Sequence, residues 1–128
     1  QMSIQLNKEI QCVMHFAGLK SVSDSVIKPI KYWDNNVNGT INLLKVMEKY
    51  NCRNIVFSSS ATVYKINTSK PVGENDPCQP VNPYGNTKLA IEKLLNDLWD
   101  QGLSNGELIA LLQGIITDIQ RGFVGEPR

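Results

Sequence analysis

The sequence predicts an α/β fold built on parallel β-strands, and three observations carry that prediction. Two short apolar runs, residues 11–16 and 54–58, have the length and composition of buried strands. Each run is followed by a segment whose apolar residues recur every three or four positions, the period of an amphipathic helix. Strand, helix, strand and helix in this order are typical of parallel βαβ units in a sheet covered on both faces.

The first predicted strand and helix occupy residues 11–16 and 33–50. The strand reads QCVMHF and ends at Ala17-Gly18. The apolar face of the helix is formed by Trp33, Val37, Ile41, Leu44 and Met47. This helical period outweighs the turn signal of the dipeptide Asn38-Gly39.

The second predicted strand, residues 54–58, is followed by a long loop and a helix that begins at Pro83. The loop, residues 65–82, is rich in Pro, Gly, Asn and Asp. Asn82 is suited to cap the helix, and proline is favoured at the first helical position. The core-facing side of this helix is expected to contain Leu94, Leu95 and Leu98. Residues 108–112 indicate a third strand, and residues 113–128 show no recognisable pattern.

The composition is that of an ordinary soluble domain. The 128 residues are 41% hydrophobic and 20% charged, and the formal net charge is +1. We therefore expect no nucleic-acid partner and no membrane partner, since no apolar run has the roughly 20 residues of a spanning helix. Three cysteines without CxxC spacing argue against a disulfide framework and a metal site. The chain starts without a secretion-signal pattern, which predicts a cytoplasmic location.

The strongest chemical signal is the pair Tyr84 and Lys88, which lie four residues apart and share one face of the predicted helix. A phenol has a pKa near 10 and is a poor base at neutral pH unless a neighbouring cation favours the phenolate. Lys88 can supply that charge, so that Tyr84 removes a proton from a substrate hydroxyl. A YxxxK pair also arises by chance in many helices, so the pair alone does not decide the function.

A run of serines, residues 58–60, directly follows the second predicted strand. Ligands of open α/β sheets bind at the carboxyl ends of the strands, where small hydroxyl groups can hydrogen-bond a sugar or a dinucleotide. Such a run is, by itself, more often a turn than a site. Together with the Tyr84–Lys88 pair on the next helix, it indicates a site that is hard to obtain by chance.

Four segments together resemble the UDP-glucose 4-epimerases of the extended short-chain dehydrogenase/reductase family. They are His15-Phe-Ala-Gly-Leu-Lys-Ser, Tyr32-Trp-Asp-Asn-Asn-Val-Asn-Gly-Thr, Phe57-Ser-Ser-Ser-Ala-Thr-Val-Tyr and Asn82-Pro-Tyr-Gly-Asn-Thr-Lys-Leu. The resemblance extends over about residues 11–99. Sugar-nucleotide 4,6-dehydratases usually have Thr-Asp-Glu-Val-Tyr after the first serine, whereas this chain has Ser60-Ala-Thr-Val-Tyr, which is similar to the epimerases.

The resemblance implies an α/β, Rossmann-like NAD-binding domain over residues 1–112, with a doubly wound parallel sheet. It also implies interconversion of UDP-glucose and UDP-galactose through a 4-keto intermediate, with NAD as the transient hydride acceptor. Tyr84 would be the catalytic base, Lys88 would lower its pKa and hold the nicotinamide ribose, and Ser60 would bridge Tyr84 and the sugar 4-hydroxyl. The implied cofactor-binding residues are Phe16, Ala17, Gly18, Lys20, Asn35, Ser58, Ser59, Tyr84 and Lys88. The single histidine, His15, is expected to have a packing or hydrogen-bonding role.

Three departures from the family pattern limit these expectations. No GxGxxG loop occurs, so we expect the sheet to lack its first βαβ unit and the adenosine half of the cofactor site. Residues 113–128 are expected to be a divergent tail in place of the C-terminal substrate domain. Lys65 stands where the family normally has a glycine, and we expect it to strain or reshape that loop.

Three functions are therefore compatible with the sequence. One is an NAD-dependent UDP-sugar 4-epimerase; without the GxGxxG loop, this chain alone is expected to bind NAD weakly and to turn over little UDP-sugar. The second is a truncated, non-catalytic remnant or interaction module of the same family. Another reductase or dehydratase of the extended family is a third option, which the missing Thr-Asp-Glu triplet disfavours. The resemblance further implies a homodimer that pairs through the predicted helices at residues 33–50 and 83–101.

Overall fold

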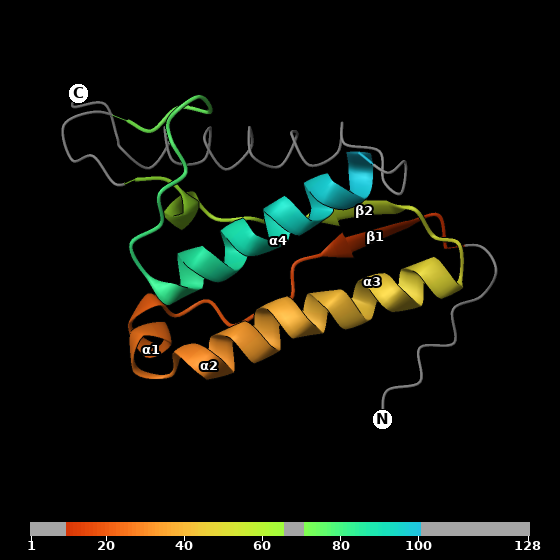
Figure 1. Cartoon of the computed structure of the whole chain (residues 1–128), viewed down its shortest axis with the longest axis horizontal. Helices are drawn as coiled ribbons and strands as arrows, with labels where there is room; N and C mark the ends of the chain where they lie inside the picture. The colour runs from red at the N-terminus through yellow and green to blue at the C-terminus, as the bar shows by residue number, and fades with distance from the viewer. Residues whose placement is uncertain (1–9, 66–70, 101–128) are drawn as a thin grey trace, which may run out of the picture.

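The computed structural model describes residues 10–65 and 71–100, which form the α/β arrangement in Figure 1. Strands β1 (Cys12–His15) and β2 (Asn54–Phe57) are parallel, with Val13 opposite Ile55 and His15 opposite Phe57. Between them lie α1 (Val22–Ile27), α2 (Pro29–Tyr32), the π-helix η1 (Trp33–Asn38) and α3 (Gly39–Lys49), and after β2 come the 3₁₀-helix η2 (Ala61–Val63) and α4 (Pro83–Asp100). The predicted α/β class and parallel βαβ unit are confirmed.

The crossover between the strands is one helical run from Pro29 to Lys49, which begins four residues earlier than predicted. Pro29 occupies the first position of α2, where its missing N–H is not needed. The run widens into a π-helix over η1 and continues as α3 through Gly39, whose φ of −58° and ψ of −44° are helical. Asn38-Gly39 is therefore not a turn, as the helical period predicted.

Helix α1 was not predicted from the sequence. Its N-cap is Ser21, whose hydroxyl accepts a hydrogen bond of 3.2 Å from the backbone N–H of Asp24. Ser25, on its inner side, is fully buried, and its hydroxyl donates to the carbonyl oxygen of Val22. The cap residue was the available sequence signal, but the six-residue helix is too short to show a clear period.

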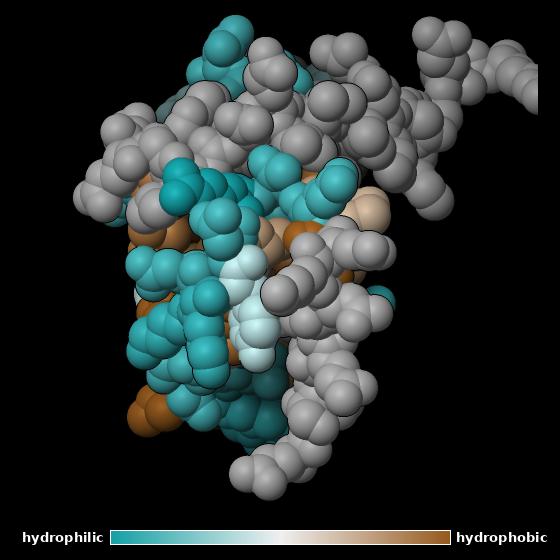
Figure 2. All heavy atoms as spheres, turned by 90° about the vertical axis from the view of Figure 1, so that its right-hand side faces the viewer, coloured by the Kyte–Doolittle hydropathy of each residue, from teal (hydrophilic) through white to brown (hydrophobic). Residues whose placement is uncertain are grey.

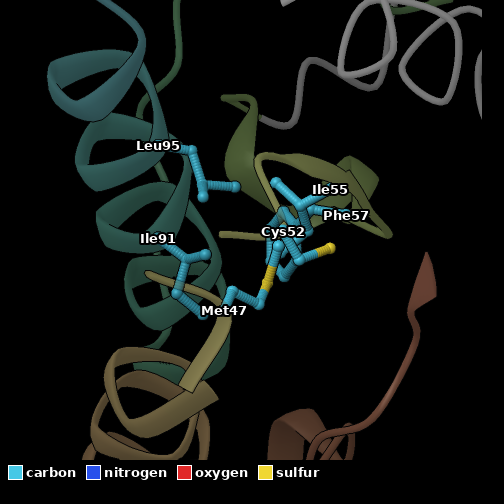
Figure 3. Close-up of a cluster of buried hydrophobic side chains, with 6 residues drawn as sticks. All are labelled: Met47, Cys52, Ile55, Phe57, Ile91 and Leu95. Carbon is cyan, nitrogen blue, oxygen red and sulfur yellow. The ribbon is translucent and has the colours of Figure 1, made fainter. Parts of the chain in front are cut away.

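The hydrophobic core lies between one face of the sheet and the helices α3 and α4. Figure 3 shows its buried members, which are Met47, Cys52, Ile55, Phe57, Ile91 and Leu95. Full burial of an aliphatic or aromatic side chain of this size contributes about 1.5–3 kcal/mol. Of the predicted face of α4, Leu95 is fully buried, and Leu94 and Leu98 are half-buried at its edges.

The other face of β1 is open in the described structure. Val13 packs against the core, whereas Met14, which alternates with it, is 65% exposed. Helices α3 and α4 supply the core together and so pack on the same face. Cover over the other face of this strand stays a prediction, because the described residues include only two strands of the sheet.

The start of α4 matches the prediction, and of the two effects expected at Lys65 the backbone strain is not found. Asn82 caps the helix, because its Oδ1 accepts a hydrogen bond of 2.8 Å from the backbone N–H of Gly85. Lys65 does not adopt the left-handed conformation, because among the described non-glycine residues only Asn51 has a positive φ. The expected strain is therefore absent. The backbone N–H of Lys65 instead donates to the carbonyl oxygen of Pro77.

The predicted strand at residues 108–112 and the tail at residues 113–128 lie outside the described residues. The division of the chain at residue 112 stays a prediction. None of the helices in the described part combines the length and the apolar character that crossing a lipid bilayer requires.

Candidate active site

The carboxyl ends of β1 and β2 meet at one edge of the sheet, and the predicted site residues gather there. The backbone N–H of Ser58 donates to the carbonyl oxygen of His15 at 3.1 Å, which extends the strand pairing by one step. The segments that follow, residues 16–18 and 58–60, therefore start side by side. Residues 16–18 are exposed, and Phe16 has 57% of its surface open to solvent. This edge is where ligands of parallel α/β sheets bind.

Lys88 reaches from α4 to the end of β2. Its Nζ donates a hydrogen bond of 2.9 Å to the carbonyl oxygen of Ser58 and lies 4.7 Å from the centroid of the Phe57 ring. Burial lowers the pKa of Lys88 because it disfavours the charged form, and the nearby carboxyl group of Glu92 acts in the opposite direction. The side chain is only 5% exposed, so its cation is held in a fixed place beside the serines.

Tyr84 lies one turn before Lys88, and the two side chains share one face of α4 as the spacing predicted. Its ring centroid is 6.0 Å from the Nζ of Lys88, and the residue is 8% exposed. The ring packs edge-on against Tyr32 of α2, and the backbone N–H of Tyr84 donates to the hydroxyl of Ser25. Helices α1 and α2 thus hold the start of α4 in position.

The three serines after β2 make three different contacts. Ser58 is bound through its carbonyl oxygen by Lys88, as described above. The buried hydroxyl of Ser59 donates to a carboxyl oxygen of Glu92 on α4. The half-buried hydroxyl of Ser60 accepts from the backbone N–H and the hydroxyl of Thr62, at 3.3 and 3.0 Å, and so begins η2. The hydroxyl proton of Ser60 is used in neither of these two bonds, so it can be donated to a ligand.

Asn36 holds the segment after β1, and sequence reasoning missed it. Its amide oxygen accepts from the backbone N–H of Leu19 at 2.8 Å, and its amide nitrogen donates to the carbonyl oxygen of Leu19 at 2.9 Å. The same nitrogen lies 3.3 Å from the hydroxyl of Thr87, which donates to the carbonyl oxygen of Tyr84. Asn36, which is 3% exposed, therefore connects this segment to the start of α4.

Asn35, the predicted cofactor residue, is exposed and donates from its amide nitrogen to the amide oxygen of Asn36 at 3.0 Å. The π-helix decides which of these neighbours turns inward, because it changes the angle between successive residues. A prediction that assumes about 3.6 residues per turn throughout the helix does not include that change. The buried anchor of the segment is therefore Asn36, and the cofactor-binding role of Asn35 stays a prediction.

His15 has the packing and hydrogen-bonding role that was expected. Its Nε2 lies 2.9 Å from the hydroxyl of Thr40, and that hydroxyl donates to the carbonyl oxygen of Asn36. The imidazole ring also packs on Phe57, with 5.7 Å between centroids. Burial lowers the pKa of His15, and the charge of Lys88 lowers it further.

The remaining predicted cofactor residues lie along the same exposed segment. Gly18 has a φ of +157°, and a Cβ atom there would approach the amide oxygen of Asn36 to 3.2 Å. Lys20 is exposed at the end of the segment. Within residues 10–65 and 71–100, no three His, Cys, Asp or Glu side chains are grouped so that they could hold a metal ion.

Comparison with known proteins identifies the family of the chain. The family model described as NAD dependent epimerase/dehydratase family matches residues 2–109. The chain belongs to this family. The predicted epimerase resemblance is thereby placed within a defined family, and the match includes all of the site residues described above.

Named members of the epimerase/dehydratase family are about half identical to the chain over the matched part. UDP-glucose 4-epimerase of Bacillus subtilis (strain 168) is 51% identical over 96 residues, which are 75% of this chain and 28% of that protein. UDP-glucose 4-epimerase 2 of Oryza sativa subsp. japonica is 54% identical over 87 residues, 68% of this chain and 21% of that protein. The chain therefore spans well under half the length of these relatives.

Solved structures show the same relationship. UDP-glucose 4-epimerase from Bifidobacterium longum, in complex with NAD+ and UDP, has a TM-score of 0.67 and 52% identity over 70% of this chain and 27% of that one. UDP-glucose 4-epimerase from Thermus thermophilus, in a complex with NAD, has a TM-score of 0.67 and 30% identity over 73% of this chain and 32% of that one. These likenesses confirm the predicted partial Rossmann-like fold.

Proposed function

We propose that this chain carries the active-site segment of an NAD-dependent UDP-glucose 4-epimerase, which interconverts UDP-glucose and UDP-galactose through a 4-keto sugar. The observation that supports this most strongly is the arrangement of Tyr84, Lys88 and the serine run at the carboxyl edge of the sheet. It occurs in a chain that is 51% identical to a UDP-glucose 4-epimerase over 96 residues.

The segment after β1 has the features that a bound dinucleotide needs. Its backbone is exposed over residues 16–18, and the amide of Asn36 holds it in place from behind. The residues that would hold NAD are Phe16, Ala17, Gly18, Lys20, Asn35, Ser58, Ser59 and Lys88. Ser59 would take part through its backbone, since its hydroxyl is bound to Glu92. When bound, NAD supplies the acceptor for hydride from the sugar and its later donor.

The chain's own residues would move the proton. Tyr84 would take the proton of the sugar 4-hydroxyl on its phenolate oxygen and return it later. The ammonium group of Lys88 lies 6.0 Å from the centre of the Tyr84 ring, one turn further along α4. Ser60 would donate its hydroxyl proton to the sugar oxygen, since its bonds with Thr62 use it as an acceptor. No acidic pair follows the serines, which favours epimerisation over dehydration.

The test is to measure NAD binding and the conversion of UDP-galactose to UDP-glucose by the purified chain. Because no GxGxxG loop is present, we expect weak NAD binding and little turnover in the wild type, and Tyr84→Phe should reduce that turnover by about 100-fold or more, the usual size of a proton-transfer contribution. Tyr50→Phe is the matched control, because Tyr50 is a half-exposed tyrosine at the end of α3. A wild-type chain with neither NAD binding nor turnover would instead identify a non-catalytic remnant or interaction module of the family.

We also propose that two copies of the chain pair through α3 and α4. An apolar groove of about 400 Å³ lies between these helices, lined among others by Ile41, Leu44, Leu94 and Leu98. Its rim carries both signs of charge, with Lys45 and Arg53 beside Glu48, as a self-complementary two-fold contact requires. Figure 2 views the molecule from the side where α3 ends, with hydrophobic atoms visible between hydrophilic ones.

The oligomeric state in solution tests this pairing. Ile41→Glu places a charge in the groove and should convert a dimer into a monomer in light scattering. Ile30→Glu is the control, since Ile30 is 83% exposed on α2 and does not line the groove. A wild-type chain that is monomeric at high concentration would contradict the proposal.

A further inference from the structure

Glu92 is a buried acidic residue to which the proposed reaction gives no role. It lies on α4, one turn after Lys88, and is 6% exposed. Its carboxyl oxygen accepts the hydrogen bond from the hydroxyl of Ser59, which is itself buried. Burying a carboxyl group is costly unless it is hydrogen-bonded, and the contact with Ser59 offsets part of that cost.

Helix α4 therefore holds the serine run at two successive points. Lys88 binds the carbonyl oxygen of Ser58, and Glu92 binds the hydroxyl of Ser59. Residues four apart on a helix lie above one another on the same face, so the two contacts follow one line along α4. The serine run is thus fixed in both position and rotation relative to the helix that carries Tyr84.

The bond of Ser59 also holds the backbone next to Ser60. Ser60 follows Ser59 directly and has extended backbone angles, with φ −151° and ψ 145°. Its hydroxyl meets Thr62 of η2, and Thr62 lies against Gly85 at the start of α4. A displacement of Ser59 from Glu92 would therefore move Ser60 as well.

Glu92 also acts on the charges around it. Lys88 is surrounded by Tyr84 on its own helix, by the ring of Phe57 and the carbonyl of Ser58 from β2 and its end, and by His15 from β1. Glu92, one turn after Lys88 on α4, raises the pKa of Lys88 against the effect of burial. It also raises the pKa values of Tyr64 and Cys78, while Lys93 opposes the effect at Cys78.

We propose that Glu92 is a positioning residue of this site: through its bond with the hydroxyl of Ser59 it anchors the serine run, and with it Ser60, against the helix that carries Tyr84 and Lys88. Its charge, one turn from Lys88, adds an electrostatic effect on that ammonium group. Its meaning for catalysis rests on the proposed function. The bond with Ser59 and the effect on Lys88, however, can be measured in the chain whether or not it turns over a UDP-sugar.

The first experiment follows the titration of Lys88 by NMR in protein labelled at the lysine ε-carbon, with Lys88→Arg used to assign the signal. Glu92→Gln keeps an oxygen that can accept from Ser59 but removes the charge, so the titration of Lys88 should shift downward in pH. Asp97→Asn is the matched control, because it removes an acidic charge from an exposed position on the same helix. An unchanged Lys88 titration in Glu92→Gln, or an equal shift in Asp97→Asn, overturns the proposal.

The second experiment keeps the test open if Glu92→Gln does not fold. Ser59→Ala removes only the hydroxyl that Glu92 binds, and amide hydrogen exchange should become faster over residues 58–62 and stay unchanged in α3. Equal exchange throughout overturns the anchoring role.

Where the wild type epimerises, Glu92→Gln should lower kcat by up to about 100-fold, with a changed pH profile and little change in KM, because a misplaced group slows the chemical step. An unaltered kcat overturns the catalytic part. An inactive wild type contradicts the proposed function. The positioning role of Glu92 is then tested by the Lys88 titration and the hydrogen-exchange data alone.

Discussion

The ammonium nitrogen of Lys88 lies 2.9 Å from the carbonyl oxygen of Ser58, and this bond joins α4 to the end of β2. The influence of the same charge reaches the other strand, since Lys88 contributes to lowering the pKa of His15. Ser58 and His15 are in turn joined by a backbone hydrogen bond of 3.1 Å. One buried cation is therefore in electrostatic contact with the ends of both strands at the proposed cofactor edge.

This arrangement makes His15 a reporter for the charge of Lys88. Lys88→Met should raise the pKa of His15 towards its ordinary value of 6.5, because a neighbouring positive charge disfavours the imidazolium form. The chain has a single histidine, so an NMR titration of its ring protons reads the effect directly. Lys93→Met, at an exposed position on the same helix, should leave the titration unchanged. The same titration curve in wild type and Lys88→Met would show that the two groups do not interact.

Gly85 allows the start of α4 to pack closely against η2. A Cβ atom at this position would lie 2.5 Å from the carbonyl oxygen of Thr62 and 2.9 Å from the Cβ of Pro80. Gly85→Ala should therefore destabilise the chain by about 1–3 kcal/mol through overpacking. The better helix propensity of alanine, about 0.5–1 kcal/mol, offsets only part of this loss. Urea unfolding followed by circular dichroism measures the difference.

Gly39 provides the matched control for this substitution. It also lies in a helical run, but a Cβ atom there meets nothing within 4 Å. Gly39→Ala should therefore stabilise the chain by about 0.5–1 kcal/mol. If both variants changed stability in the same direction, close packing at Gly85 would not be the cause.

The elements with a clear period were predictable, and the elements set by tertiary contacts were not. The stripe that contains Leu95 and the cap and proline at Asn82 and Pro83 predicted α4 well, because they act within one segment. The role of Asn36 was not predictable, because it depends on a π-turn that changes which residue faces inward. The site showed the same limit: the spacing of Tyr84 and Lys88 predicted their shared face, whereas the bond between Ser59 and Glu92 joins residues 33 positions apart.

Asn36 should matter more for stability than other asparagines of the same helix. Asn36→Ala removes both bonds to the backbone of Leu19, and it leaves those partly buried groups without their amide partner. The expected loss is about 1–3 kcal/mol in the free energy of unfolding. NAD binding should weaken at the same time, because the segment over residues 16–18 is no longer held in place. Isothermal titration calorimetry and chemical denaturation measure the two effects.

Asn38→Ala is the control for that experiment. Asn38 lies two residues further along the same helical run and is exposed. Its amide nitrogen donates to the side chain of Asp34, which lies on the same run. We expect a change within about 0.5 kcal/mol. Equal losses in the two variants would assign the effect to helix propensity, and Asn36 would then have no special role.

The lowered pKa of His15 predicts how stability changes with pH. In the folded chain the imidazole binds its proton only below the ordinary value of 6.5, because burial and Lys88 both disfavour the charged form. Between the folded pKa and 6.5 the unfolded chain therefore binds more protons than the folded one, and stability falls as the pH is lowered through this window.

In His15→Gln, the side-chain N–H of glutamine can replace the hydrogen-bond donor to Thr40, but glutamine does not titrate. The variant should therefore lose less stability than the wild type when the pH is lowered from neutral through the ordinary histidine value of 6.5. Denaturation curves at a series of pH values test this. An identical pH dependence in the two proteins would mean that the folded and unfolded chains bind the proton of His15 equally well.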